Sequence, residues 1–113
     1  THVPKKIFEV IKGKDISDID ASFKPVTTSY EVYKERSAST FEIFDSIQSP
    51  NIHRVYPHTL FCDGKIKGRC VTHDIDDVFY ADDDHPSTKG AEMIAGLIME
   101  QVENAEAKIK KNY

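Results

Sequence analysis

The sequence has no long hydrophobic run. Nowhere in its 113 residues are there about 18 consecutive apolar residues, the length that a membrane-spanning helix needs. The first residues, 1–5, also lack the apolar core of a secretory signal. We therefore expect no membrane or export segment within residues 1–113, and the length is that of one domain or part of one.

Basic charge is also scarce. Lysine and arginine total 15 against 19 acidic residues, which gives a net charge of −4. The only basic cluster is at the C-terminus, at Lys108, Lys110 and Lys111. Nucleic acid is therefore not an expected partner, because binding to its phosphates requires a concentrated basic surface.

Cysteine is limited to two residues, Cys62 and Cys70, which enclose the polar stretch CDGKIKGRC. Their spacing matches no common zinc motif. It is typical of one disulfide in an oxidising compartment or of two unrelated thiols in a reducing one, and we favour the disulfide. By the chain-entropy relation, so small a ring would stabilise the fold by roughly 2 to 3 kcal/mol.

Three helices are predicted. Pro4 and Gly13 bracket a short one at residues 4–12, and Thr28 with Glu31 forms a capping-box pattern before a longer one that ends near Ser49 and Pro50. The third follows Ser87 as N-cap. Its apolar residues recur at i, i+3 and i+4 spacing, as expected for a helix with one buried face: Ala91, Ile94, Ala95, Ile98, Val102 and Ala105.

Strand signals are few. Residues 52–56, IHRVY, and residues 78–80, VFY, are rich in β-branched and aromatic side chains. Helices alternating with such strands predict an α/β fold with a parallel sheet flanked by helices. Two strands cannot cover three helices, so we expect the chain to complete a larger domain, to oligomerise or to be part of a longer protein.

The most reactive residue pattern is Asp82-Asp83-Asp84-His85-Pro86. A turn that joins positions i and i+3 can bring the Asp82 carboxylate onto one ring nitrogen of His85, the arrangement of a general base and the acid that orients it. Two other interpretations remain open. The aspartates can simply be favourable charge before a helix N-terminus, or they can bind a cation, although neither acidic stretch has the glycine and final glutamate of an EF-hand.

From Tyr56 onward the sequence resembles the C-terminal end of the SGNH/GDSL hydrolase superfamily. It is most similar to the SGNH domains fused to acyltransferase family 3 membrane proteins, which O-acetylate bacterial surface polysaccharides. The matching features, in order, are Tyr56-Pro57, the Cys62 and Cys70 loop, Tyr80, the Asp82 to His85 pattern, Ser87 and Gly90-Ala91. One departure is Pro86, where leucine is usual.

A larger departure is the missing nucleophile. The family's catalytic serine lies in a Gly-Asp-Ser block, and no serine of this sequence has that context. Ser87 is too close to His85 along the chain to be its partner. The resemblance therefore implies that residues 1–113 are the C-terminal half of a three-layer SGNH-like catalytic domain, which alone should not catalyse acyl transfer.

The resemblance implies a serine-dependent O-acyltransferase or carbohydrate esterase, with His85 as base, Asp82 as its orienter, and no cofactor or metal. The expected partners are the half of the domain that carries the serine, the membrane acyltransferase domain, and a sugar acceptor such as lipopolysaccharide O-antigen. The implied location is the periplasmic side of a bacterial inner membrane, where a Cys62–Cys70 disulfide would form. The alternative is a non-catalytic binding module whose acidic loop, residues 74–84, holds a cation.

Overall fold

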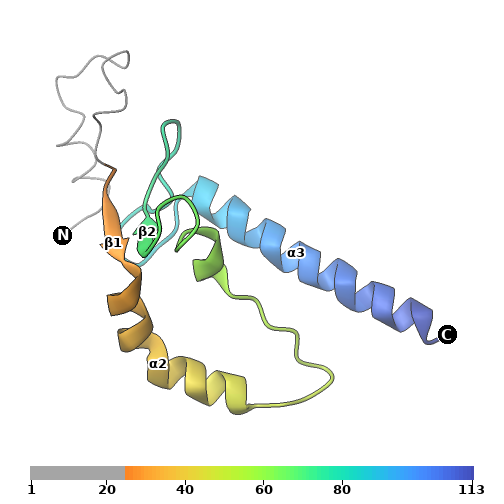
Figure 1. The fold of residues 1–113 in the computed structure, drawn as a ribbon. Coiled ribbons are helices and arrows are strands. Elements are labelled where there is room, and N and C mark those ends of the chain that lie inside the picture. Colours follow the sequence, from red (N-terminus) through yellow and green to blue (C-terminus); the bar gives the residue numbers. More distant parts are fainter. Residues whose placement is uncertain (1–24) are drawn as a thin grey trace.

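The computed structural model describes residues 25–113. In chain order they form strand β1 (Thr27–Ser29), helix α2 (Tyr30–Ser46), the short 3₁₀ helix η2 (Pro57–Leu60), strand β2 (Arg69–Val71) and helix α3 (Thr88–Lys111). Figure 1 shows the two strands and η2 gathered in a small central unit from which α2 and α3 extend in different directions. The helix predicted at residues 4–12 lies outside the described residues.

The two strands pair with each other in an antiparallel sheet. Thr27 lies opposite Val71, and Ser29 lies opposite Arg69. Side chains reinforce the pairing, since Arg69 Nε donates to Thr27 Oγ1 at 3.0 Å. Neither strand was predicted from the sequence. The predicted parallel sheet is not confirmed in residues 25–113, where these two strands form the one sheet.

The predicted strand at residues 52–56 is wrong for the described structure, in which this segment is irregular and leads into η2. Among residues 25–113 no strand lies beside it to accept its backbone hydrogen bonds. Residues 78–80 likewise form only isolated bridges, between His73 and Val78 and between Tyr80 and Pro86. Both segments have strand-forming side chains, but a strand needs a partner before it becomes part of a sheet.

Helix α2 begins one residue later than the capping-box pattern predicted. Its N-cap is Ser29, whose hydroxyl accepts a hydrogen bond from the backbone N–H of Val32 at 3.3 Å. The helix ends at Ser46, just before the predicted stop at Ser49 and Pro50. None of its residues is fully buried.

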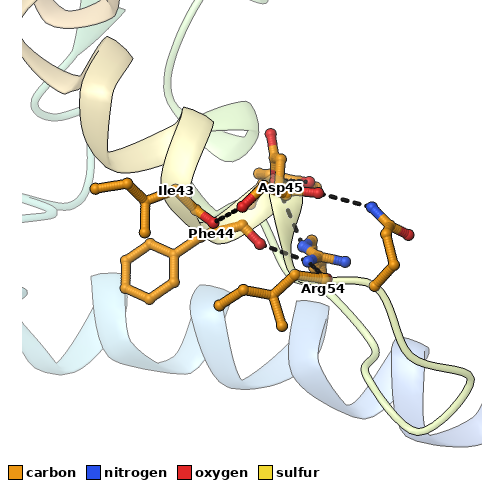
Figure 2. A network of polar contacts seen from close by, with 8 residues as sticks. Ile43, Phe44, Asp45 and Arg54 are labelled. Atoms are coloured by element: carbon orange, nitrogen blue, oxygen red, sulfur yellow. Dashed lines mark hydrogen bonds and ion pairs between the residues drawn. The ribbon is translucent and has the colours of Figure 1, made fainter.

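The C-terminal end of α2 is closed by Arg54 (Figure 2). The guanidinium donates to the carbonyl oxygens of Phe44 and Ile47 and lies 3.5 Å from the carboxylate of Asp45. Tyr56 donates its hydroxyl to the same carboxylate at 2.7 Å. A cation at this end of a helix satisfies carbonyls that have no partner within the helix and is favoured by the helix dipole.

The core is small and lies where β2, η2 and the start of α3 meet. Phe61, Val71 and Phe79 are buried in it, and the rings of Phe61 and Phe79 lie 5.4 Å apart between centroids. Met93 and Ile94 of α3 pack against this cluster. Farther along α3 the predicted apolar stripe is open to solvent, with Ile98 46% and Val102 42% exposed.

Cys62 and Cys70 form a disulfide beside this core, so the predicted pairing is present in the structure. The loop that they enclose is also tied by backbone bonds, from Asp63 N–H to the Arg69 carbonyl and from Val71 N–H to the Phe61 carbonyl, each 2.9 Å long. The disulfide therefore fixes a hairpin that supplies two of the three buried core residues.

Candidate active site

The candidate site is the loop between Phe79 and Ser87, which the structure holds at both ends. The backbone N–H of Ser87 donates to the Phe79 carbonyl at 2.9 Å, and that of Ala81 donates to the His85 carbonyl at 2.9 Å. The Ser87 hydroxyl donates to the carbonyl of Val78 and accepts from the backbone N–H of Gly90 at 3.1 Å. One side chain thus caps α3 as predicted and anchors the preceding loop.

Within this loop the Asp82 carboxylate meets the His85 ring. The Nδ1 atom of His85 lies 2.8 Å from Asp82 Oδ1 and 2.9 Å from Oδ2. Asp82 Oδ1 also accepts the backbone N–H groups of Asp84 at 3.0 Å and His85 at 2.8 Å. The carboxylate is therefore fixed by the turn itself and places a proton acceptor on one side of the imidazole.

This geometry shifts both acid–base equilibria. Hydrogen bonds from the backbone N–H of Asp84 and from the His85 side chain lower the pKa of Asp82 to about 2. The hydrogen bond to Asp82 and its negative charge raise the pKa of His85 above its ordinary value of 6.5. Asp82 is thus ionised at neutral pH, and its charge stabilises a protonated His85.

The remaining ring nitrogen of His85 faces solvent. The side chain is 71% exposed, and among residues 25–113 no group hydrogen-bonds to its Nε2. With Nδ1–H donated to Asp82, Nε2 carries the lone pair that can accept a proton. A hydroxyl brought to this surface from elsewhere would find an oriented base.

An apolar cavity of about 240 Å³ adjoins the loop on the side of α2. Tyr80, Asp84 and Pro86 from the loop and Tyr33 and His58 from α2 and η2 are among the residues that line it. The His85 ring lies outside this lining. Burial lowers the pKa of His58, so the ring at the cavity wall favours its neutral form, the opposite of His85.

The same loop contains the one group in the described part of the chain that could hold a metal ion, formed by Asp82, Asp84 and His85. One atom from each lies within 4.8 Å of the others. However, Asp82 Oδ1 already accepts two backbone N–H groups, and a histidine nitrogen is a poor ligand for calcium. The hydrogen bonding of this group fits the orientation of a base better than the binding of a hard cation.

In the other acidic stretch, residues 74–77, the Asp74 carboxylate also accepts hydrogen bonds from its own turn. Asp74 Oδ1 accepts the backbone N–H groups of Asp76 at 3.0 Å and Asp77 at 2.7 Å. Lysines lie near both ends, with Lys65 3.9 Å from Asp74 and Lys89 3.9 Å from Asp77. These contacts stabilise a turn at residues 74–77.

Sequence reasoning missed why Gly90 belongs to the site. A Cβ atom at Gly90 would lie 2.1 Å from the carbonyl oxygen of Phe79, so only glycine allows α3 to start against the loop. Gly90 is buried, and its backbone N–H donates to the hydroxyl of Ser87, the N-cap residue of α3. The motif contained the residue, but the contact that explains it depends on where Phe79 lies in space.

Comparison with protein-family models matches residues 5–100 to the SGNH domain that is fused to AT3 domains, the acyltransferase family 3 domains of membrane proteins. The chain belongs to this SGNH family. The match covers most of the sequence and includes the loop that carries Asp82 and His85. Membership of this family makes the domain one of hydrolase or acyltransferase type. No curated protein and no solved structure shows significant similarity to the chain. No helix within residues 25–113 has the length and apolar character to cross a membrane.

Proposed function

We propose that residues 1–113 form the C-terminal part of an SGNH catalytic domain in which His85 is the general base and Asp82 orients it. The observation that carries this proposal is the contact of His85 Nδ1 with both oxygens of Asp82, at 2.8 and 2.9 Å. This contact leaves Nε2 free to act. The raised pKa of His85 supports the same role, because a base in this reaction must also hold the proton that it receives.

The nucleophile in this proposal is a serine outside these residues, since none of the serines here follows Gly-Asp. Its hydroxyl proton passes to His85 Nε2 while its oxygen attacks the acyl carbonyl. The protonated ring then returns the proton to the departing oxygen of the donor, which leaves an acyl-serine. In the second half, His85 takes a proton from the acceptor hydroxyl as that oxygen attacks the acyl-serine. The ester bond to the serine then breaks, and His85 returns the proton to the serine oxygen.

The acceptor in this proposal is a sugar hydroxyl of a bacterial surface polysaccharide, and water would make the same chemistry an esterase reaction. Fusion to AT3 domains in this family supports a membrane acyltransferase domain as the partner that delivers the acyl group. The Cys62–Cys70 disulfide supports an oxidising compartment, which for such a protein would be the periplasm.

The test uses the full-length parent protein with p-nitrophenyl acetate as a generic acyl donor. His85→Ala should lower the turnover number about 10²- to 10⁴-fold, the usual contribution of a positioned base. Asp82→Asn should lower it by a smaller factor, because serine and histidine can still act together without the orienter.

Two substitutions serve as matched controls. His53→Ala removes an exposed histidine outside the loop, and Asp76→Asn neutralises an exposed aspartate of the other acidic stretch. Both should keep the activity of the unmodified protein. Full turnover in the His85→Ala protein would remove the assigned role, and calcium-dependent activity that a chelator abolishes would favour the cation-binding alternative.

A further inference from the structure

Ser87 joins the loop of the candidate site to helix α3 and is hydrogen-bonded on both sides. Its backbone N–H donates to the Phe79 carbonyl at 2.9 Å, and its own carbonyl accepts the backbone N–H of Ala91 at 2.8 Å. Its hydroxyl donates to the carbonyl of Val78 and accepts the backbone N–H of Gly90 at 3.1 Å. Two of these four hydrogen bonds therefore reach the segment that enters the loop, and two reach the first turn of α3.

The single proton of the Ser87 hydroxyl is committed to Val78. The other partner of this oxygen is a backbone N–H, that of Gly90, which can only donate. The hydroxyl therefore accepts from Gly90 and donates its own proton to the Val78 carbonyl. One side chain in this way links the start of α3 to the residue that precedes the loop.

Asp82 and His85, by contrast, form a unit within the loop. The Asp82 carboxylate accepts the backbone N–H groups of Asp84 and His85 and contacts the His85 ring. The His85 carbonyl accepts the backbone N–H of Ala81. Each of these hydrogen bonds begins and ends within residues 81–85. They fix the imidazole relative to the carboxylate, but they do not fix either group relative to the rest of the domain.

The position of His85 Nε2 therefore depends on how the loop is attached. At the start of the loop is Phe79, a core residue that is 3% exposed. At its end, Pro86 has no backbone N–H to donate, so the first backbone amide after His85 that can hold the loop is that of Ser87. A base works only within hydrogen-bond distance of the proton that it takes, so a small shift of the loop would slow the reaction even with the Asp82–His85 contact intact.

Gly90 shows how closely the loop and the helix are packed at this junction. A Cβ atom at Gly90 would lie 2.1 Å from the Phe79 carbonyl oxygen and 3.3 Å from the Cβ atom of Pro86. The first turn of α3 thus packs directly against both ends of the loop. The hydrogen bonds of Ser87 hold the two together at this distance.

We infer that Ser87 is a positioning residue of the reaction, whose hydroxyl holds the loop against α3 so that His85 Nε2 can reach the serine. This rests on the proposed function, in which His85 is the base. Asp82 sets the tautomer and the pKa of the ring, whereas Ser87 sets where the ring lies. Loss of either residue should therefore cause a different kinetic defect.

The pH profile of kcat/KM separates the two roles, measured on the full-length parent protein with p-nitrophenyl acetate. Ser87→Ala should lower the plateau above the pKa of His85 roughly 10- to 100-fold, the cost of a displaced catalytic group. The acid limb should stay in place, because the Asp82–His85 contact remains. Asp82→Asn should instead move the acid limb to lower pH. Ser87→Thr keeps a hydroxyl and should restore most of the plateau. An unchanged plateau in Ser87→Ala, or an acid limb that moves as in Asp82→Asn, would overturn the proposal.

Ser87→Asp separates the bond to Val78 from the cap on α3. An aspartate at the N-cap accepts the Gly90 N–H, but its carboxylate has no proton to donate to the Val78 carbonyl on the plateau of the profile. The plateau should therefore fall as in Ser87→Ala, although the helix stays capped. A full plateau in Ser87→Asp would show that the cap alone is sufficient and would also overturn the proposal.

Ser29→Ala is the matched control. Ser29 caps α2 by accepting the backbone N–H of Val32 at 3.3 Å, and it lies outside the loop. Its loss removes a helix cap without touching the site. Assayed below the onset of thermal unfolding of every variant, Ser29→Ala should keep the full plateau. A plateau as low as that of Ser87→Ala would assign both losses to general destabilisation and remove the positioning role.

The outcome for His85 distinguishes this inference from the proposed function. Loss of turnover in His85→Ala together with a full plateau in Ser87→Ala would keep His85 as the base and remove the positioning role of Ser87. Full turnover in His85→Ala would remove both roles.

Discussion

Residues 61–90 and residues 41–56 differ in how many of their backbone amides and apolar side chains find partners in the described part of the chain. The first region is closed by a disulfide, a buried aromatic pair and a series of backbone hydrogen bonds. The second has amides, those of residues 53–56, that donate to no other residue within 25–113, and it has apolar side chains that face solvent, such as Phe44 and Ile47. The loop that carries Asp82 and His85 belongs to the closed region. Its geometry is therefore set by this chain, whereas the strand-like segment depends on what lies beside it.

Two phenylalanines allow the sharpest test of this contrast. Phe79 is 3% exposed in the core, and Phe44 is 61% exposed on α2. In the 113-residue chain, Phe79→Ala should lower the free energy of unfolding by about 3 to 5 kcal/mol. Phe44→Ala should change it by less than about 0.5 kcal/mol. Urea titrations followed by circular dichroism measure both, and equal losses would show that the two regions do not differ as described.

The disulfide should contribute the next largest effect. Replacing Cys62 and Cys70 together by alanine opens a ring of nine residues in the closed region. Because the unfolded chain then gains freedom, the unfolding free energy should fall by roughly 2 to 3 kcal/mol. Reduction of the unmodified chain should give the same loss. A double variant as stable as the oxidised chain would mean that the backbone bonds alone close the hairpin.

The two described glycines of α3 form a third pair. Gly90→Ala forces a Cβ atom toward the Phe79 carbonyl and should destabilise the chain by about 1 to 3 kcal/mol. At Gly96 no atom lies within 4 Å of the added Cβ, so Gly96→Ala should stabilise the helix by about 0.5 to 1 kcal/mol. Thermal unfolding of the two variants should therefore shift in opposite directions. A stabilised Gly90→Ala protein would show that α3 can move away from the loop without loss.

The same contrast explains which features the sequence could predict. The N-cap at Ser87, the Asp82–His85 contact and the Cys62–Cys70 pairing depend on residues within nine positions of each other, where cap chemistry and turn spacing decide the outcome. The paired residues of strands β1 and β2 are 40 to 44 positions apart in the sequence, and no local pattern in a three-residue strand specifies such a partner. At residues 52–56 the prediction was wrong for the opposite reason. The local pattern is that of a strand, but the described structure holds no neighbouring strand with which this segment could pair.

Two histidines extend the comparison to acid–base behaviour. Asp82 raises the pKa of His85 above 6.5, and burial lowers the pKa of His58 below it. In Asp82→Asn the His85 pKa should fall toward 6.5 while that of His58 stays unchanged. A pH titration followed by the NMR signals of both rings measures the two shifts in one sample, with His58 as the internal control.

The sign of this shift also fixes the pH dependence of activity. A general base must be neutral to accept a proton, so the raised pKa places the acid limb of the kcat/KM profile of the parent above pH 6.5, and Asp82→Asn should move that limb to lower pH. Stability changes in the other sense. The contribution of His85 to the free energy of unfolding is fully present below pH 6.5 and is lost as the pH rises through the raised pKa of His85. The contribution of Asp82 is fully present above pH 3.8 and is lost as the pH falls toward about 2. An acid limb that stays in place in Asp82→Asn, while the NMR pKa of His85 falls, would show that a different group limits the reaction.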